Sequence, residues 1–439
     1  MSPFAVKAIQ LLLSLSILIV LHELGHFIPA KLFKTRVEKF FLFFDVKFAL
    51  FKTKIGETVY GIGWLPLGGY VKIAGMIDES MDKEQMEKPP QPWEFRSKPA
   101  WQRLIIMLGG VTVNIIVGFV IYASILYFYG RDITTNEDLP NGFAVAEQFK
   151  EYGFEDGDKV LKINGEELLN VMDINKYLFL RDVETVEVQH QNGTVEALSV
   201  PEDIGMKMFK EGNIRPFQPI RQTVIDTVAA DYPAAGILMK NDKIVSVNGV
   251  ETKYWHEFEN AIEDAKENTF VVSRNGSLDT LKITPNEDGA IGVQNFGRDF
   301  IDNGTHLSYN LGESIAGGAS FGTEKLVDYA KQFKYVFTKE GATQVGGFGA
   351  IGNLFPDTWD WLSFWETTAL ISIILAFMNI LPIPALDGGH VMFLLYEIVT
   401  GRKPNDKFME YAQMVGFFVL IALVLFANGN DIYRWLFGG

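Results

Sequence analysis

The sequence predicts an α-helical polytopic membrane protein with four transmembrane helices and two small β-rich domains inserted between the second helix and the third. Three observations predict this fold: four long apolar segments, an acidic block between the second and the third of them, and an internal repeat within that block. The 439 residues are 48% apolar and 13% aromatic, which is a high apolar content for a wholly soluble protein.

A helix needs about 20 mostly apolar residues to cross the hydrocarbon core of a bilayer, and four apolar segments are candidates for such spans. The first segment has too long an apolar run for a secretory signal peptide, and no small-residue cleavage site follows it. The alternative for this segment, a buried helix of a soluble core, is disfavoured by the three further spans. The segments are residues 4–32, 104–129, 364–384 and the shorter 411–426.

Positive charge collects in two of the segments that connect these spans. By the positive-inside rule, residues 33–103 and 386–410 are expected in the cytoplasm. Both termini and the block between the second and third spans are then expected outside. The basic residues that decide this orientation are Lys34, Arg36, Lys39, Arg402, Lys403 and Lys407.

The block at residues 131–363 holds 21 Lys and Arg against 38 Asp and Glu, a net charge of −17 that makes it unsuited to nucleic acid. Within it, "GDKVLKINGEE" at 157–167 recurs 84 residues later as "NDKIVSVNGVE". Each copy carries an alternating apolar run that ends in Asn-Gly, a tight-turn signal. We therefore expect two β-rich domains, at 131–215 and 216–300.

The second copy, "YPAAGILMKNDKIVSVNG", resembles the core of PDZ domains, and "YGFEDGDKVLKING" of the first copy resembles it less closely. The resemblance implies domains that take up extended peptides by strand addition; a spacer that binds nothing is the alternative. Residues 309–339 follow a helical apolar period and are expected to lie on the outer membrane surface or against the repeats. The remaining divisions are a first membrane half at 1–130, a surface linker at 301–363 and a second membrane half at 364–439.

The first span contains the sequence "LHELGHF", in which His22, Glu23 and His26 form H-E-x-x-H. Ionisable groups in a membrane span cost about 2.5–3.5 kcal/mol each on insertion scales, so they usually mark a functional site. Imidazoles four residues apart lie on one helix face and can bind one metal ion, beside a glutamate that can act as a base. The chain has no cysteine, so any further ligand must be His, Asp or Glu.

Catalytic zinc usually has three protein ligands and one open position, and Asp387 in "MNILPIPALDGGH" is the strongest candidate for the third. Pro382 and Pro384 break the third span before it. Non-helical backbone at membrane depth is tolerated where it is buried in protein or lines a wet cavity. H-E-x-x-H and Asp387 both lie near inner ends of spans, so one metal ion could join them.

H-E-x-x-H in a first span with "NILPIPALDGG" in a later one resembles the site-2 protease family of intramembrane zinc metalloproteases, in particular its bacterial regulator-of-sigma-E type with tandem PDZ domains. The resemblance implies Zn²⁺ held by three side chains, a general base, and a substrate contact at Asn379, which could instead cap the broken helix. His390 is not counted as a ligand. The implied ligands are His22, His26 and Asp387, and the implied base is Glu23.

A second stretch, "WLPLGGYVKIAG" at 64–75, resembles the reentrant β-loop of this family, which is thought to offer an edge strand to an unwound substrate. Its residues expected to bind substrate are Leu67, Gly68, Gly69 and Tyr70; an ordinary cytoplasmic hairpin is the alternative. The chain departs from the family at Gly110-Val111, where Gly-Pro often precedes Asn114, and at "GGFGAIG", which lacks a proline.

The resemblance implies a multi-pass protease of the bacterial cytoplasmic membrane, with its termini and PDZ domains in the periplasm and its active site towards the cytoplasm. Its substrates would be single-span membrane proteins, such as an anti-sigma factor or signal-peptide remnants. They would be cut in or near the lipid bilayer after another protease has shortened their outer part. The alternative is a membrane-anchored PDZ scaffold or chaperone with a structural metal. That site would need a fourth protein ligand and would give Glu23 no role.

Overall fold

The computed structural model describes residues 1–76, 89–295 and 304–437, without the side chains of Leu67 and Asp406. The chain divides into two compact units. One, here called the membrane unit, combines Met1–Gly130 with Ser308–Gly439, and the other, the repeat unit, is Arg131–Leu307.

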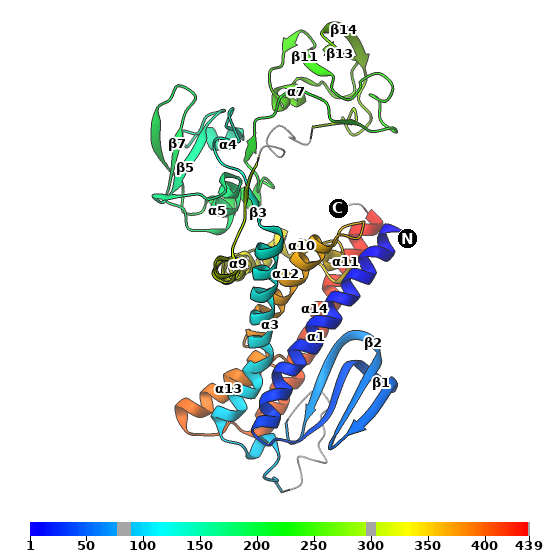
Figure 1. Cartoon of the computed structure of the whole chain (residues 1–439), viewed down its shortest axis with the longest axis vertical. Coiled ribbons are helices and arrows are strands. Elements are labelled where there is room, and N and C mark those ends of the chain that lie inside the picture. The colour runs from blue at the N-terminus through cyan, green and yellow to red at the C-terminus, as the bar shows by residue number, and fades with distance from the viewer. Residues whose placement is uncertain (77–88, 296–303, 438–439) are drawn as a thin grey trace. The chain divides into compact units, whose positions relative to one another are not determined.

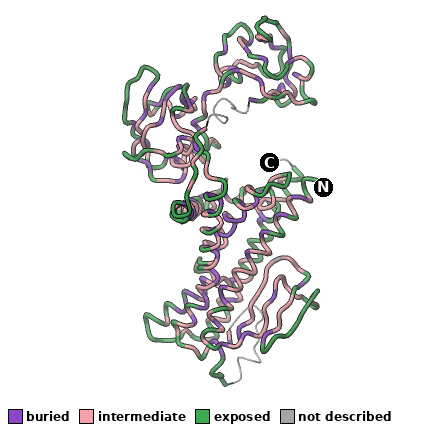
Figure 2. Tube along the Cα trace, in the orientation of Figure 1, coloured by how far each residue is buried: buried purple, intermediate pink, exposed green. Residues whose placement is uncertain are grey.

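Four helices of the membrane unit are long and apolar enough to cross a bilayer, as predicted (Figure 1). Buried positions recur along the first two, whereas the last is mostly exposed (Figure 2). These apolar exposed surfaces are suited to lipid, and the chain is a membrane protein. The helices are α1 (Pro3–Leu32), α3 (Ala100–Tyr129), α12 (Trp361–Ile380) and α14 (Asp406–Phe437).

Glycines bring α3 against its neighbours. A Cβ atom on Gly25 of α1 would stand 2.4 Å from the carbonyl oxygen of Gly109, and one on Gly118 would stand 2.7 Å from the side chain of Ile373 in α12. The backbones of α1 and α3 therefore touch, as small residues allow in membrane helix pairs. This contact lies one residue before His26 and fixes the spacing around the H-E-x-x-H motif.

The segment at 386–410, expected only as the cytoplasmic connection between the third and fourth spans, contains a helix that the sequence pattern did not predict, α13 (Asp387–Thr400). Gly388 and Gly389, residues typical of turns, lie in the first turn of this helix, where a Cβ atom on either would overlap the backbone of residues 380–384. The third span also ends earlier than predicted, at Ile380. Asp387 is thus the first residue of a helix packed tightly on the broken end of α12.

Strands β1 (Val37–Ile55) and β2 (Thr58–Ile73) form an antiparallel hairpin beside α1 (Figure 1). Residues 39–42 of β1 pair with residues 59–62 of β2 and also with residues 69–72. Within the described residues this sheet contains no other strand, so the second half of β2 is an edge. Several apolar side chains of the hairpin are exposed, among them Phe48 and Trp64, which stack.

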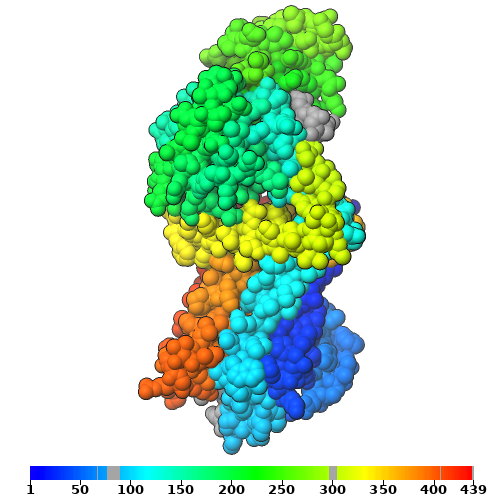
Figure 3. Space-filling model, turned by 60° about the vertical axis from the view of Figure 1, so that its left-hand side comes forward, coloured from blue at the N-terminus to red at the C-terminus, as the bar shows by residue number. Residues whose placement is uncertain are grey.

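The predicted amphipathic helix is α9 (Leu311–Gln332), which ends seven residues before the predicted boundary. It lies across α3 (Figure 3) because two of its glycines leave room. Cβ atoms on Gly318 and Gly322 would stand 2.5 Å from the backbone of Ala123 and 2.3 Å from the ring of Phe119. Short helices follow: η3 (Phe333–Phe337), α10 (Lys339–Gln344) and α11 (Phe348–Gly352), and η1 (Phe95–Ser97) precedes α3.

The repeat unit contains two four-stranded sheets of equivalent order, β6-β5-β7-β8 and β12-β11-β13-β14. Strands β5 and β6 begin 84 residues before β11 and β12, and the Asn-Gly turns place Asn164 and Asn248 at positive φ, 51° and 52°. Each sheet covers its own apolar core. The sheets are β5 (Lys159–Ile163), β6 (Glu166–Glu167), β7 (Thr185–Gln189) and β8 (Val195–Ser199), then β11 (Lys243–Val247), β12 (Val250–Glu251), β13 (Asn268–Arg274) and β14 (Ser277–Ile283).

Shorter elements complete this unit, with β3 paired to β16, β4 to β9 and β10 to β15. The helices are α4 (Glu147–Lys150), η2 (Val171–Asp173), α5 (Ile174–Leu180), α6 (Ile204–Lys210) and α7 (Trp255–Ala261). The strands are β3 (Arg131–Ile133), β4 (Phe143–Val145), β9 (Phe217–Pro219), β10 (Thr227–Val228), β15 (Val293–Gln294) and β16 (Thr305–Leu307).

The two repeats hold the same buried aspartate with different cations. Asp158 and His190 of the first copy are 2.7 Å apart, and the equivalent pair of the second copy, Asp242 and Arg274, is also 2.7 Å apart. Arg274 lowers the pKa of Asp242 through its hydrogen bond. Burial alone would lower the pKa of His190, but the hydrogen bond and charge of Asp158 outweigh it and raise that pKa above its ordinary value.

We expect the first repeat, but not the second, to lose stability as the pH rises above the unfolded histidine pKa of about 6.5. A raised pKa means that folded His190 holds its proton more tightly. The stabilisation is therefore complete below the unfolded value of about 6.5 and is lost as the pH rises through the folded pKa. The release of one proton changes the equilibrium constant for local unfolding of this repeat by at most about tenfold per pH unit. Hydrogen exchange of the full chain, corrected for intrinsic rates, measures this. His190→Arg should abolish the trend, and a trend unchanged in that variant would contradict it.

Candidate metal centre

The three predicted metal ligands lie together in the membrane unit. His22 and His26 project from the same face of α1 with their Nε2 atoms 3.2 Å apart. Asp387, at the start of α13, places its Oδ2 atom 3.3 Å from each of these nitrogens. Two segments 361 residues apart in sequence, counted from His26 to Asp387, thus converge on one point.

Contacts from α3 direct both imidazoles towards that point. The Nδ1 atom of His26 is 2.8 Å from the carbonyl oxygen of Ile106, which can only accept, so Nδ1 carries the proton and Nε2 keeps its lone pair. The Nδ1 atom of His22 is 3.1 Å from the side-chain amide of Asn114. The amide oxygen of Asn114 is buried without a hydrogen-bond partner. A 180° flip of this side-chain amide places the oxygen where it can accept the Nδ1–H of His22.

The residue facing these rings is Gly110. A Cβ atom at this position would stand 2.4 Å from Nε2 of His26 and 2.6 Å from Cε1 of His22. Any side chain here would therefore fill the space in which the two imidazoles meet. The glycine keeps that space open although α3 packs directly against α1.

The arrangement fits zinc. Bonds of about 2.0–2.1 Å in a tetrahedral site place neighbouring ligand atoms about 3.3 Å apart, and the three separations here are 3.2, 3.3 and 3.3 Å. Oδ2 of Asp387 is buried and has no hydrogen-bond partner, as expected of an oxygen that meets a cation. In the described part of the chain no other group of three His, Asp or Glu side chains converges in this way.

Glu23 lies between this group and the hairpin. The backbone of Val71 in β2 lies near its carboxylate, and a Cβ atom on Gly69 would stand 3.7 Å from its Cγ atom. A carboxylate beside a metal site can accept a proton from water and return it to a leaving group. The second half of β2 is therefore the strand next to the predicted base.

The remaining predicted residues have different surroundings. Gly69 lies next to Glu23, but the hydroxyl of Tyr70 donates to Asp45, 2.7 Å away, and its ring stacks on Phe41. Gly68 is in β2 before them, and the side chain of Leu67 lies outside the described residues. Asn379 is half-buried in the last turn of α12, and no hydrogen bond joins its side chain to another described residue.

Two polar residues near the centre were given no role from the sequence. Asn114 contacts His22, and Gln413 of α14 hydrogen-bonds the turn before Asp387. Both are polar and buried in apolar spans. That pattern is the same signal that singled out H-E-x-x-H, and it could have identified them.

Comparison with known proteins identifies the family of this chain. The model of peptidase family M50 matches residues 10–423. The regulator of sigma E protease of Haemophilus influenzae is 27% identical over 96% of this chain and 98% of its own length. Metalloprotease MmpA of Caulobacter vibrioides is 24% identical, over 99% and 97%. A Rickettsia conorii protein named as a candidate zinc metalloprotease is 24% identical, over 97% and 98%. The chain therefore belongs to peptidase family M50, the site-2 protease family, and is a zinc-dependent membrane metalloprotease.

Proposed function

We propose that this protease hydrolyses peptide bonds in or near the transmembrane segment of single-span membrane proteins. The observation that carries the proposal is the position of the metal centre. Its ligands lie on a membrane-spanning helix and beside the broken end of another, so a peptide bond that reaches them is at membrane depth. A soluble substrate would have no route to such a site except through the bilayer or a wet cavity.

In this proposal His22, His26 and Asp387 hold the zinc ion. Zinc supplies Lewis acidity, which polarises a peptide carbonyl and makes water acidic enough to attack it near neutral pH. Glu23 accepts the proton of the attacking water and donates it to the amine that leaves. Ile106 and Asn114 keep the imidazoles in the tautomer and orientation that this requires.

The edge of β2 is the proposed substrate platform. A peptide bond in a helix is shielded by its own hydrogen-bonded backbone, so a transmembrane substrate must be extended before it is cut. An edge strand can hold such a segment through backbone hydrogen bonds. The contact between Val71 and Glu23 supports this role for Leu67, Gly68 and Gly69, because the strand that would hold the substrate also touches the base. Tyr70 would support the strand through Asp45.

The two repeats are proposed to be PDZ-like domains on the periplasmic side of the bacterial inner membrane, with the active site towards the cytoplasm. The equivalent order of their sheets supports a common domain type, and the basic residues next to the spans support the orientation. One relative is named as a regulator of sigma E protease, which supports regulatory substrates such as an anti-sigma factor. The domains would exclude substrates whose outer part is still intact.

A pair of single-span substrates that differ only in their outer part tests this proposal. The full chain, purified in detergent with zinc, should cut the shortened substrate within or beside its membrane segment, at least about tenfold faster than the substrate with its intact outer domain. Mass spectrometry of the products locates the cleaved bond. Equal rates would overturn the size filter, and cleavage confined to the outer part would overturn the membrane site.

A further inference from the structure

The last helix, α14, touches the rest of the membrane unit at few points. In its described part the buried residues are Gln413, Gly416 and Ala427, while apolar neighbours such as Val415 are exposed. Gln413 and Gly416 are three residues apart and therefore share one face of the helix. Both meet the segment that leads to Asp387.

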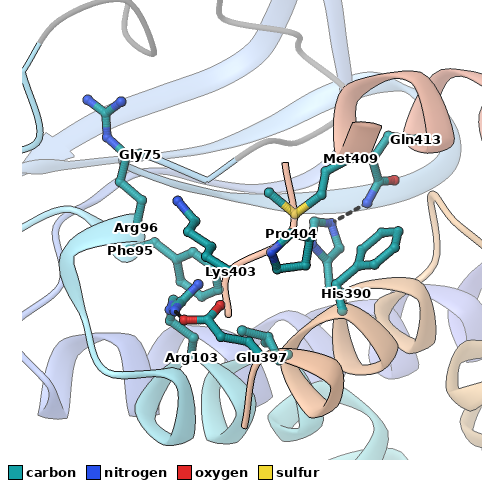
Figure 4. Close-up of a pocket in the computed structure, with 12 residues that line it drawn as sticks. Gly75, Phe95, Arg96, Arg103, His390, Glu397, Lys403, Pro404, Met409 and Gln413 are labelled. Carbon is teal, nitrogen blue, oxygen red and sulfur yellow. Dashed lines mark hydrogen bonds and ion pairs between the residues drawn. The ribbon is translucent and has the colours of Figure 1, made fainter. Parts of the chain in front are cut away.

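The side chain of Gln413 forms hydrogen bonds with this segment on both sides of Asp387. Its Oε1 atom accepts the backbone N–H of Ala385, two residues before the aspartate. Its Nε2 atom is 2.9 Å from Nε2 of His390, three residues after it (Figure 4). A glutamine is suited to this position because its amide supplies an acceptor and a donor together.

Gln413 hydrogen-bonds the backbone of Ala385, which has an unfavourable conformation. Ala385 has φ of 77°, in the left-handed region that a residue with a Cβ atom avoids. One turn along α14, a Cβ atom on Gly416 would stand 1.9 Å from the carbonyl oxygen of Pro384, so the helix lies directly on the turn. Such a conformation persists only where the surroundings enforce it.

The other end of α13 is fixed separately. Arg103 of α3 and Glu397 of α13 form an ion pair in the wall of the pocket that His390 and Gln413 also line (Figure 4). The helix that starts with Asp387 is therefore tied to α3 at Glu397. The turn before it is tied to α14 at Gln413.

We propose that Gln413 is a positioning residue of the metal centre, which fixes the left-handed turn at Ala385 and thereby the carboxylate of Asp387. Metal sites require ligand distances within about 0.2 Å of their ideal values, so a turn that relaxes two residues before Asp387 would disturb its position relative to the two histidines. This inference rests on the proposed ligand set. It makes α14, which contributes no ligand, a determinant of zinc affinity.

The test is the zinc dissociation constant of the full chain in detergent, measured by competition with a chelator. Gln413→Met keeps the volume of the side chain and removes both hydrogen bonds, and is expected to bind zinc about 10–100-fold more weakly. Gln413→Glu keeps the acceptor for Ala385 and should lie closer to wild type than to Gln413→Met. Val415→Ala, on the exposed face of the same helix, is the matched control and should bind zinc as wild type does.

A second readout separates positioning from damage to the fold. Cleavage by Gln413→Met should fall at limiting zinc and recover when zinc is added in excess, because the variant lacks affinity rather than structure. Wild-type zinc affinity in Gln413→Met would overturn the inference, as would a loss that Val415→Ala shares or that excess zinc does not restore. A wild-type chain without zinc would overturn the ligand set itself, so the two failures are distinguishable.

Discussion

Replacing Glu23 by glutamine is expected to lower the rate of peptide cleavage about 10²–10⁴-fold while about one zinc ion per chain is retained. The substitution preserves the shape of the side chain and removes the group that takes the proton from water. It leaves the ligand atoms of His22, His26 and Asp387 in place. The cleavage rate of a shortened single-span substrate and the zinc content of the same samples measure this.

The matched control for that variant is Glu57→Gln, which makes the same chemical change at an exposed position between β1 and β2. It should cut at the wild-type rate. Cleavage by Glu23→Gln within a few fold of wild type would assign proton transfer to another group. Loss of zinc together with cleavage would mean that Glu23 belongs to the metal site itself.

Replacing Asp387 by alanine is expected to remove the zinc ion. Two imidazoles from one helix turn would remain, and a third ligand contributes more than the roughly 10–100-fold in affinity that a change outside the ligand set usually costs. The zinc content after dialysis against a weak chelator measures the loss. Asp357→Ala, at an exposed aspartate that pairs with Lys7, is the control and should keep its zinc. Zinc retained at wild-type affinity by Asp387→Ala would show that another residue is the third ligand.

Much of the membrane unit was predictable because its signals are local in the sequence. An apolar segment of 20 residues specifies a spanning helix in a bilayer, where only intrahelical hydrogen bonds can satisfy the backbone. Histidines four residues apart specify a shared helix face. The convergence of Asp387 on the two histidines followed from topology, because both motifs lie near ends of spans on the same predicted side.

Other parts could not be predicted because their partners have no signal of their own. The proton acceptor of His26 is the backbone carbonyl of Ile106, which any residue would supply. The need for glycine at Gly110 exists only once α1 and α3 are packed. Helix α13 was missed because Gly388 and Gly389 are typical of turns, and only contact with the end of α12 requires them inside a helix. Asn114 and Gln413, by contrast, carried a readable signal as polar residues in apolar spans.

The measurement that tests the central claim most directly is zinc content and cleavage on the same purified samples of wild type, Glu23→Gln and Asp387→Ala. We predict about one zinc ion per chain with cleavage in the wild type, zinc without cleavage in Glu23→Gln, and neither in Asp387→Ala. Cleavage that persists in a sample without zinc, or that does not depend on Glu23, would contradict a metal centre built from His22, His26 and Asp387.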